Sequence, residues 1–176
     1  MADTDEARTS KAQTKLIAIG SFLVGGIIGL SAGIAVGLFI FPYIFQPPPA
    51  METVADRASK TVVAKATFRH ANPSDPVHFG KGSATVFTGL VHLERNFEVG
   101  PGPKYHVFLS PKAEVNKTED FDEAKALDLG PIKAFAGSQN YPVPAGTDLA
   151  RYKSIVIWCK AFGVLISPAP LEFAPK

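Results

Sequence analysis

The sequence predicts a mainly β domain, a small antiparallel β-sandwich or open barrel, that follows one N-terminal transmembrane helix. Two features of the pattern support this fold class. The run from Leu16 to Phe45 contains no charged residue. Beyond Thr61, short apolar segments alternate with turns rich in glycine, proline and asparagine. The part of the chain outside the apolar run is long enough for one compact domain with its own core, and too short for two.

The apolar run, residues 16–45, is predicted to be an uncleaved signal anchor. A helix needs about 20 apolar residues to cross a bilayer, and this run exceeds that length. The apolar region of a cleavable signal peptide is usually only ~7–15 residues long. Residues 47–49 are all proline, where a cleavage site would otherwise lie. The anchor therefore makes membrane lipid the first expected partner of this chain.

Basic residues predict the direction of the anchor. Arg8, Lys11 and Lys15 lie in the tail formed by residues 1–15, and no further basic residue occurs until Arg57. Because positive charge near a span favours the cytoplasmic side, we expect the N-terminus in the cytoplasm. The C-terminal domain is then extracytoplasmic in a single-pass protein of the cell membrane, and periplasmic if the cell is bacterial.

Small residues recur every fourth position along the anchor. At helical spacing they form a groove in which a second helix could pack, and this predicts a homo-oligomer or a membrane-protein partner. The alternative is the ordinary glycine content of membrane helices. The residues of the groove are Ser21, Gly25, Gly29, Gly33 and Gly37.

The rest of the chain divides into a proline-rich stalk at residues 46–60 and a β domain at 61–174. Roughly seven to nine short strands are expected, and only Glu119 to Leu127 could form a helix, a short one. The clearest strand segments are residues 61–68, 83–87, 90–94, 105–110, 154–159 and 163–167.

Alternation within two of these segments predicts which side chains share a face. In the first, Tyr105 lies with Val107 and Leu109, opposite Phe108. In the second, Cys159 falls on the same face as the apolar residues at 155 and 157. Trp158 and Lys160 lie on the opposite face, so Cys159 is expected to point toward the core.

Composition excludes several classes of function. The net charge is +2 with acids and bases intermixed, so no basic surface for nucleic acid is expected. We find no nucleophile elbow, phosphate-binding loop or pair of histidines at metal-ligand spacing, which argues against a stand-alone enzyme and a metal site. The one cysteine, Cys159, excludes a disulfide within the chain and any multi-cysteine metal site.

Four segments in order resemble the DM-thirteen domain, also called the electron-transfer DM domain: residues 75–87, 92–103, 105–111 and 127–172. The most specific stretch runs from Gln139-Asn140-Tyr141 through Pro144-Ala145-Gly146 to Ile157-Trp158-Cys159. Where the family usually has acidic residues, this chain has Lys104 and Ser138. The resemblance spans about residues 61–173.

The resemblance implies a small β-rich extracytoplasmic module in which Cys159 takes part in redox chemistry. The cysteine would act as a bare thiol or as a ligand to a prosthetic group such as haem, with Trp158 beside it. This gives the first functional hypothesis, a membrane-anchored accessory for redox chemistry or electron transfer. It predicts that Cys159→Ser abolishes function while the fold is retained.

The second hypothesis is a non-catalytic module that binds an envelope protein or a glycan. The expected binding loops are Asn72–His78 and Gly137–Pro144, the latter containing Gln139, Asn140 and Tyr141. Cys159 would then be a small buried core residue. A disulfide between two chains is a third role for Cys159, and it would need an exposed sulfur.

Overall fold

The computed structural model describes residues 3–76 and 78–174, without the side chains up to residue 14 and at positions 39, 42 and 43. The side chains of Arg8 and Lys11, on which the predicted orientation rests, lie outside this description. The chain forms two compact units, Met1–Phe45 and Gln46–Lys176, and each is described by itself.

The first unit is the helix α1, Asp3–Ile44. It begins well before the apolar run because residues 3–15 are rich in good helix formers such as alanine, glutamate, glutamine and lysine. The segment Lys15–Leu38 is long and apolar enough to cross a membrane. Large apolar side chains are exposed throughout its described part, which is typical of a helix that faces lipid rather than water.

The second unit is mainly β, as the sequence predicts, with short 3₁₀ turns η1 to η4. The described strands are β1 (Ala50–Met51), β2 (Val62–Thr67), β3 (Gly80–Lys81), β4 (Ser83–Phe87), β5 (Leu90–Leu93), β6 (Glu98–Val99), β7 (Tyr105–Ser110), β8 (Leu127–Pro131), β9 (Gly137–Pro142), β10 (Ser154–Cys159) and β11 (Val164–Phe173). The turns are η1 (Arg57–Ser59), η2 (Thr118–Asp120), η3 (Glu123–Lys125) and η4 (Leu149–Arg151).

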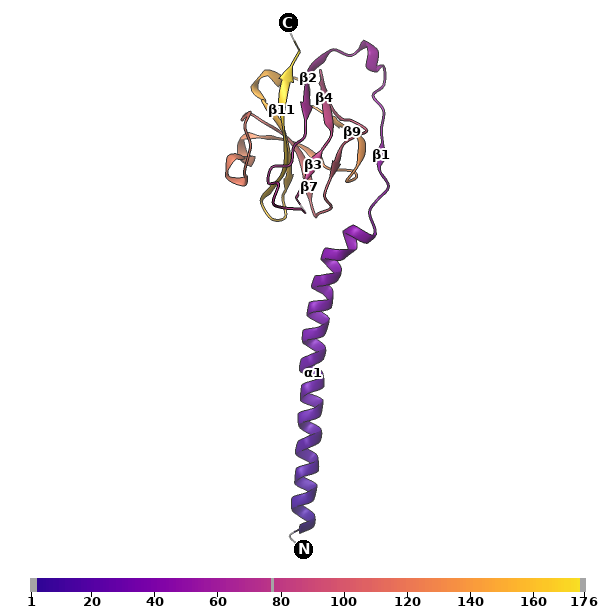
Figure 1. The fold of residues 1–176 in the computed structure, drawn as a ribbon, viewed down its shortest axis with the longest axis vertical. Helices are drawn as coiled ribbons and strands as arrows, with labels where there is room; N and C mark the ends of the chain where they lie inside the picture. The colour runs from indigo at the N-terminus through magenta and orange to yellow at the C-terminus, as the bar shows by residue number, and fades with distance from the viewer. Residues whose placement is uncertain (1–2, 77, 175–176) are drawn as a thin grey trace. The chain divides into compact units, whose positions relative to one another are not determined.

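Nine of these strands form one curled, half-barrel sheet in the order β1-β9-β5-β4-β2-β11-β10-β7-β8. Neighbouring strands are antiparallel except β1, which lies parallel to β9. The strands β3 and β6 pair separately as a small antiparallel ribbon. Figure 1 shows the strands curving around a common interior. The open-barrel form of the predicted fold is therefore confirmed.

Apolar side chains fill both faces of the half formed by β7, β10 and β11. The concave face holds the main core, in which Tyr105, Val107 and Leu109 are buried. On the convex face, Phe108 and Trp158 belong to a second cluster, which the segment containing Val115 and Phe121 covers. The predicted alternation of faces is confirmed, and Cys159 belongs to the main core.

Residues 119–127, which could form a short helix by sequence, lie in the region of the 3₁₀ turns η2 and η3, and no α-helix forms there. The carboxylate of Asp120 accepts the backbone N–H groups of Asn116 and Lys117 at 3.0 and 3.2 Å, which closes a tight turn. Phe121 then packs beside Trp158, with ring centroids 4.6 Å apart. Burial of the Phe121 ring interrupts residues 119–127, so the segment does not continue as one long helix.

Residues directly after the proline run contact the edge of the sheet. Ala50 donates its N–H to Ala136 at 2.9 Å, and Glu52 donates its N–H to Ser138 at 3.0 Å. Gly137 lies between these two bonds with φ +89°, and a Cβ there would overlap the backbone of Ala50. The glycine therefore permits the close approach of β1 to β9.

Candidate functional site

Cys159, the candidate redox residue, lies at the end of β10 and is 0% exposed. Its cross-strand neighbours are Tyr105 on β7 and Val164 on β11. The sulfur Sγ donates a hydrogen bond to the carbonyl oxygen of Pro103 at 3.2 Å. The thiol is thus enclosed by the core on one side and by a loop on the other.

The loop that covers the thiol, Gly100–Lys104, is held at both ends. The N–H of Gly100 donates to Phe79 at 3.0 Å, and the carbonyl of Lys104 accepts the N–H of Lys160 at 3.1 Å. Pro103 itself is exposed, so one residue separates the sulfur from solvent. A Cβ on Gly102 would overlap the phenol of Tyr105, so the loop and this ring are in close contact.

In the closed arrangement the sulfur of Cys159 is covered and hydrogen-bonded. The thiolate, rather than the thiol, attacks disulfides and binds metals, and here the sulfur uses its proton to bond a carbonyl. The nearby cation of Lys160 offers little help, because it is bound by Asp128 at 3.0 Å and Glu123 at 3.1 Å on the other face of the strand. Reaction at Cys159 requires that the sulfur leave Pro103.

Trp158, proposed beside Cys159 as a cofactor contact, points to the opposite face of β10 and is 6% exposed. It packs in the second cluster with Phe108 and Phe121. Among the described side chains, its indole Nε1 is the buried nitrogen that has no hydrogen-bond partner. Trp158 and Cys159 therefore do not face a common site.

The site does not fit haem at Cys159. Ligation by a thiolate needs a cleft wide enough for the ring beside the sulfur. Here the sulfur contacts core side chains and the Pro103 carbonyl, and Cys159 lines neither of the cavities of about 510 Å³ described for this chain. No step through haem is therefore derived.

Gln139 and Tyr141, expected in a binding loop, lie in strand β9 and are buried. Gln139 is 0% exposed, and its side-chain oxygen accepts the N–H of Lys133 at 2.9 Å and the hydroxyl of Tyr141 at 2.8 Å. Its side-chain nitrogen donates to Ala134 at 2.8 Å. Burial raises the pKa of Tyr141 far above its ordinary value. These contacts fix the turn before β9 in place.

Asn140 points outward and joins a polar network with the segment after the anchor. Its amide nitrogen donates to Thr53 at 2.8 Å, and its oxygen bonds Nδ1 of His92 at 2.7 Å. The carboxylate of Glu52 accepts the N–H of Asn140 at 2.6 Å and the ammonium of Lys133 at 2.7 Å. Partial burial raises the pKa of Glu52, but these hydrogen bonds outweigh it and hold the pKa below its ordinary value.

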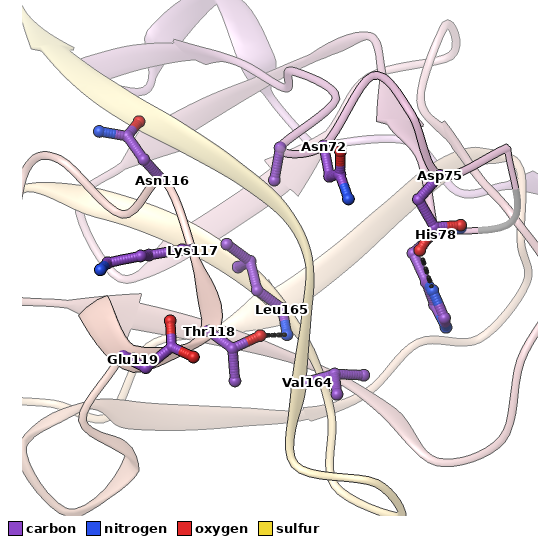
Figure 2. Close-up of a pocket in the computed structure, with 10 residues that line it drawn as sticks. Asn72, Asp75, His78, Asn116, Lys117, Thr118, Glu119, Val164 and Leu165 are labelled. Carbon is purple, nitrogen blue, oxygen red and sulfur yellow. Dashed lines mark hydrogen bonds and ion pairs between the residues drawn. The ribbon is translucent and has the colours of Figure 1, made fainter.

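A separate polar cavity of about 510 Å³ lies between two loops and the start of β11 (Figure 2). The loop Asn72–His78, which the sequence indicates as a binding loop, contributes one wall. Residues 116–119 contribute the facing wall, and Ala71, Val164 and Leu165 add apolar surface. Ala71 and Leu165 also pack in the second cluster.

Sequence reasoning does not find the second wall of this cavity. Residues 116–119 follow an irregular segment, and no local pattern indicates that they lie opposite the loop at residues 72–78. The segment is joined to β11 by the long-range bond from the Leu165 N–H to the Thr118 hydroxyl oxygen at 3.2 Å. The sequon formed by residues 116–118 is the one local signal there, and it indicates only an exposed turn.

The curled sheet, the buried thiol and the loop above it belong to one small β domain. The family model described as Electron transfer DM13 matches residues 73–171, more than half of the chain, and the chain belongs to this family. No curated protein and no solved structure matches the chain.

Proposed function

We propose that this chain is a membrane-anchored redox accessory whose acting group is the bare thiol of Cys159. The observation that carries the proposal is the place of this thiol, the sole one in the sequence. It lies within a family domain described by electron transfer and directly beneath the exposed loop at Pro103. The misfit of haem favours a thiol mechanism over a ligand mechanism.

The proposed chemistry is thiol–disulfide exchange with a disulfide-bearing partner. When the loop Gly100–Lys104 opens, Cys159 loses its proton and its sulfur attacks one sulfur of the partner disulfide. The partner's S–S bond breaks, a mixed disulfide forms, and the leaving thiolate takes up a proton. A third thiol of the partner then attacks the partner's sulfur in the mixed disulfide, which releases Cys159 as a thiol and leaves the partner with a rearranged disulfide.

The proposal includes the predicted topology. The helix α1 would anchor the chain with its N-terminus in the cytoplasm and the β domain outside, where oxidising conditions permit such exchange. Protease added to cells that have lost their outer barrier, but whose cell membrane is intact, should then digest the β domain. A domain digested only after the membrane is broken would contradict this orientation.

Exchange on the native protein tests the chemistry. The full chain in detergent is incubated with glutathione disulfide, and its mass and visible spectrum are recorded. We expect one glutathione added to the folded protein, no haem band, and no addition to Cys159→Ser. If the thiol reacts only at the rate of global unfolding, Cys159 is a core residue and the proposal fails.

A further inference from the structure

The polar cavity between the loops 72–78 and 116–119 has no part in thiol chemistry, because Cys159 does not line it. Its volume of about 510 Å³ lies within the ~300–1,000 Å³ range of ligand pockets. Figure 2 shows side chains of the two loops on opposite sides of Val164 and Leu165. The cavity therefore has the size and the facing walls of a small-molecule site.

The side chains of one wall are fixed by local hydrogen bonds that leave further atoms for a ligand. Nδ1 of His78 lies 2.6 Å from a carboxylate oxygen of Asp75 and donates to it, so the other ring nitrogen, Nε2, remains for a ligand. The side-chain oxygen of Asn72 accepts the N–H of Ser74 at 3.1 Å, and the two N–H groups of its amide remain as donors.

The hydrogen bonds of the facing wall, residues 116–119, also leave polar atoms for a ligand. The side-chain oxygen of Asn116 accepts from Arg69 at 2.9 Å, which leaves the amide N–H groups as donors. The hydroxyl of Thr118 accepts the N–H of Leu165 at 3.2 Å and keeps its own proton to donate. The exposed carboxylate of Glu119 adds an acceptor. Donors and acceptors are therefore present on both described walls of the cavity.

Charge and lining select among ligand classes. The lining carries the carboxylates of Asp75 and Glu119 against the one ammonium of Lys117, and this negative balance disfavours phosphate and other anions. Among the described residues, no group of three or more His, Cys, Asp and Glu side chains could hold a metal ion. The lining offers no aromatic ring apart from the imidazole of His78, so planar ligands lack a stacking surface.

We infer that this cavity binds a short saccharide. Each sugar hydroxyl is both a donor and an acceptor, which suits the mixed set formed by Asn72, His78, Thr118 and Glu119. The carbon face of a sugar ring suits the apolar surface of Leu165 and its neighbours. Binding at this site does not depend on the redox state of Cys159.

The test uses the full chain in a detergent without a sugar headgroup. Binding of glucose, galactose, mannose, N-acetylglucosamine, cellobiose and chitobiose is measured by calorimetry and by ligand-observed NMR. We expect at least one of these saccharides to bind. His78→Gln and Glu119→Gln should each weaken that binding about tenfold, the effect of losing one strong hydrogen bond to a ligand.

Matched controls separate the cavity from general effects. His106→Gln removes another histidine bonded to an aspartate, with 2.9 Å between Nδ1 of His106 and the carboxylate of Asp128. Glu172→Gln removes another exposed carboxylate. Both residues lie outside the cavity, so both variants should leave saccharide binding unchanged. If His78→Gln loosens the loop that contains it, the result for Glu119→Gln alone tests the inference. Within the described part of the chain no hydrogen bond uses the carboxylate of Glu119, so this variant should leave the fold unchanged.

Three results would overturn the inference. The first is no saccharide binding at ~10 mM, a concentration that detects millimolar ligands. The second is binding that Glu119→Gln leaves unchanged, which places the sugar elsewhere. The third is that short peptides bind in the cavity and saccharides do not, which assigns it to a protein partner.

Discussion

Replacement of Gly102 by alanine tests whether the loop Gly100–Lys104 controls access to the thiol. A Cβ at this position would overlap the hydroxyl and ring of Tyr105, which is buried and packs edge-on against Phe135 at 6.3 Å. Either the ring moves within the core or the loop lifts. Because overpacking of this kind costs about 1–3 kcal/mol, the closed loop should lose that much stability relative to the open one.

The lower stability of the closed loop raises the reactivity of the Cys159 thiol. When the loop closes faster than the reagent reacts, the labelling rate is proportional to the population of the open state. A change of 1–3 kcal/mol then raises the labelling rate of Cys159 roughly 5- to 150-fold. The assay is stopped labelling with iodoacetamide, followed by mass measurement, on the full chain under native conditions.

A core variant on another strand, β5, provides the control. Leu93→Ala removes a fully buried side chain on β5 and should lower global stability by about 2–5 kcal/mol. Leu93 lies opposite Ala84 and Gln139 on the neighbouring strands, so opening of the loop leaves β5 paired and labelling of Cys159 should stay unchanged. The reasoning is refuted if Gly102→Ala leaves the rate unaltered, or if Leu93→Ala raises it by the full factor of its stability loss.

The other predictions concern stability, measured by denaturant unfolding. Glu52→Gln should cost about 1 kcal/mol, a figure discounted because the side chain is 36% exposed. Because the folded pKa of Glu52 is lowered, its contribution to stability is present above the ordinary pKa range of a carboxyl group and is lost as the pH falls through the folded pKa. The Glu52→Gln variant should therefore lose less stability on acidification than the native protein. Identical pH profiles of the two proteins would contradict this. Gln139→Leu should cost about 2–4 kcal/mol, because it strands the N–H of Lys133 and the hydroxyl of Tyr141, whereas a loss under 1 kcal/mol would show that water replaces the amide. Gly82→Ala should cost about 3 kcal/mol or more, because φ is +95° and the added Cβ meets the backbone of residue 96; a neutral effect would mean that this turn adapts.

Local patterns predict the elements that local physics controls. Alternation along residues 105–110 and 154–159 places Tyr105 and Cys159 on the core face, because side chains of a strand must alternate between its faces. The apolar helix, long enough to cross a membrane, follows from its length without charge. Residues 119–127, which could form a short helix by sequence, form no α-helix, because burial of Phe121 is a tertiary contact that outweighs local helix preference.

The sequence by itself determined the mainly β class, the apolar helix, the family and the inward direction of Cys159. Only the tertiary structure decided that Pro103 covers the sulfur, that Trp158 faces away from it, and that Gln139 is enclosed in the fold. The cavity likewise joins residues 72–78 to 116–119 and to β11. The physical reason is that periodicity reports which face of an element is buried, whereas the partner that covers it depends on how the sheet curls and which distant loops meet there.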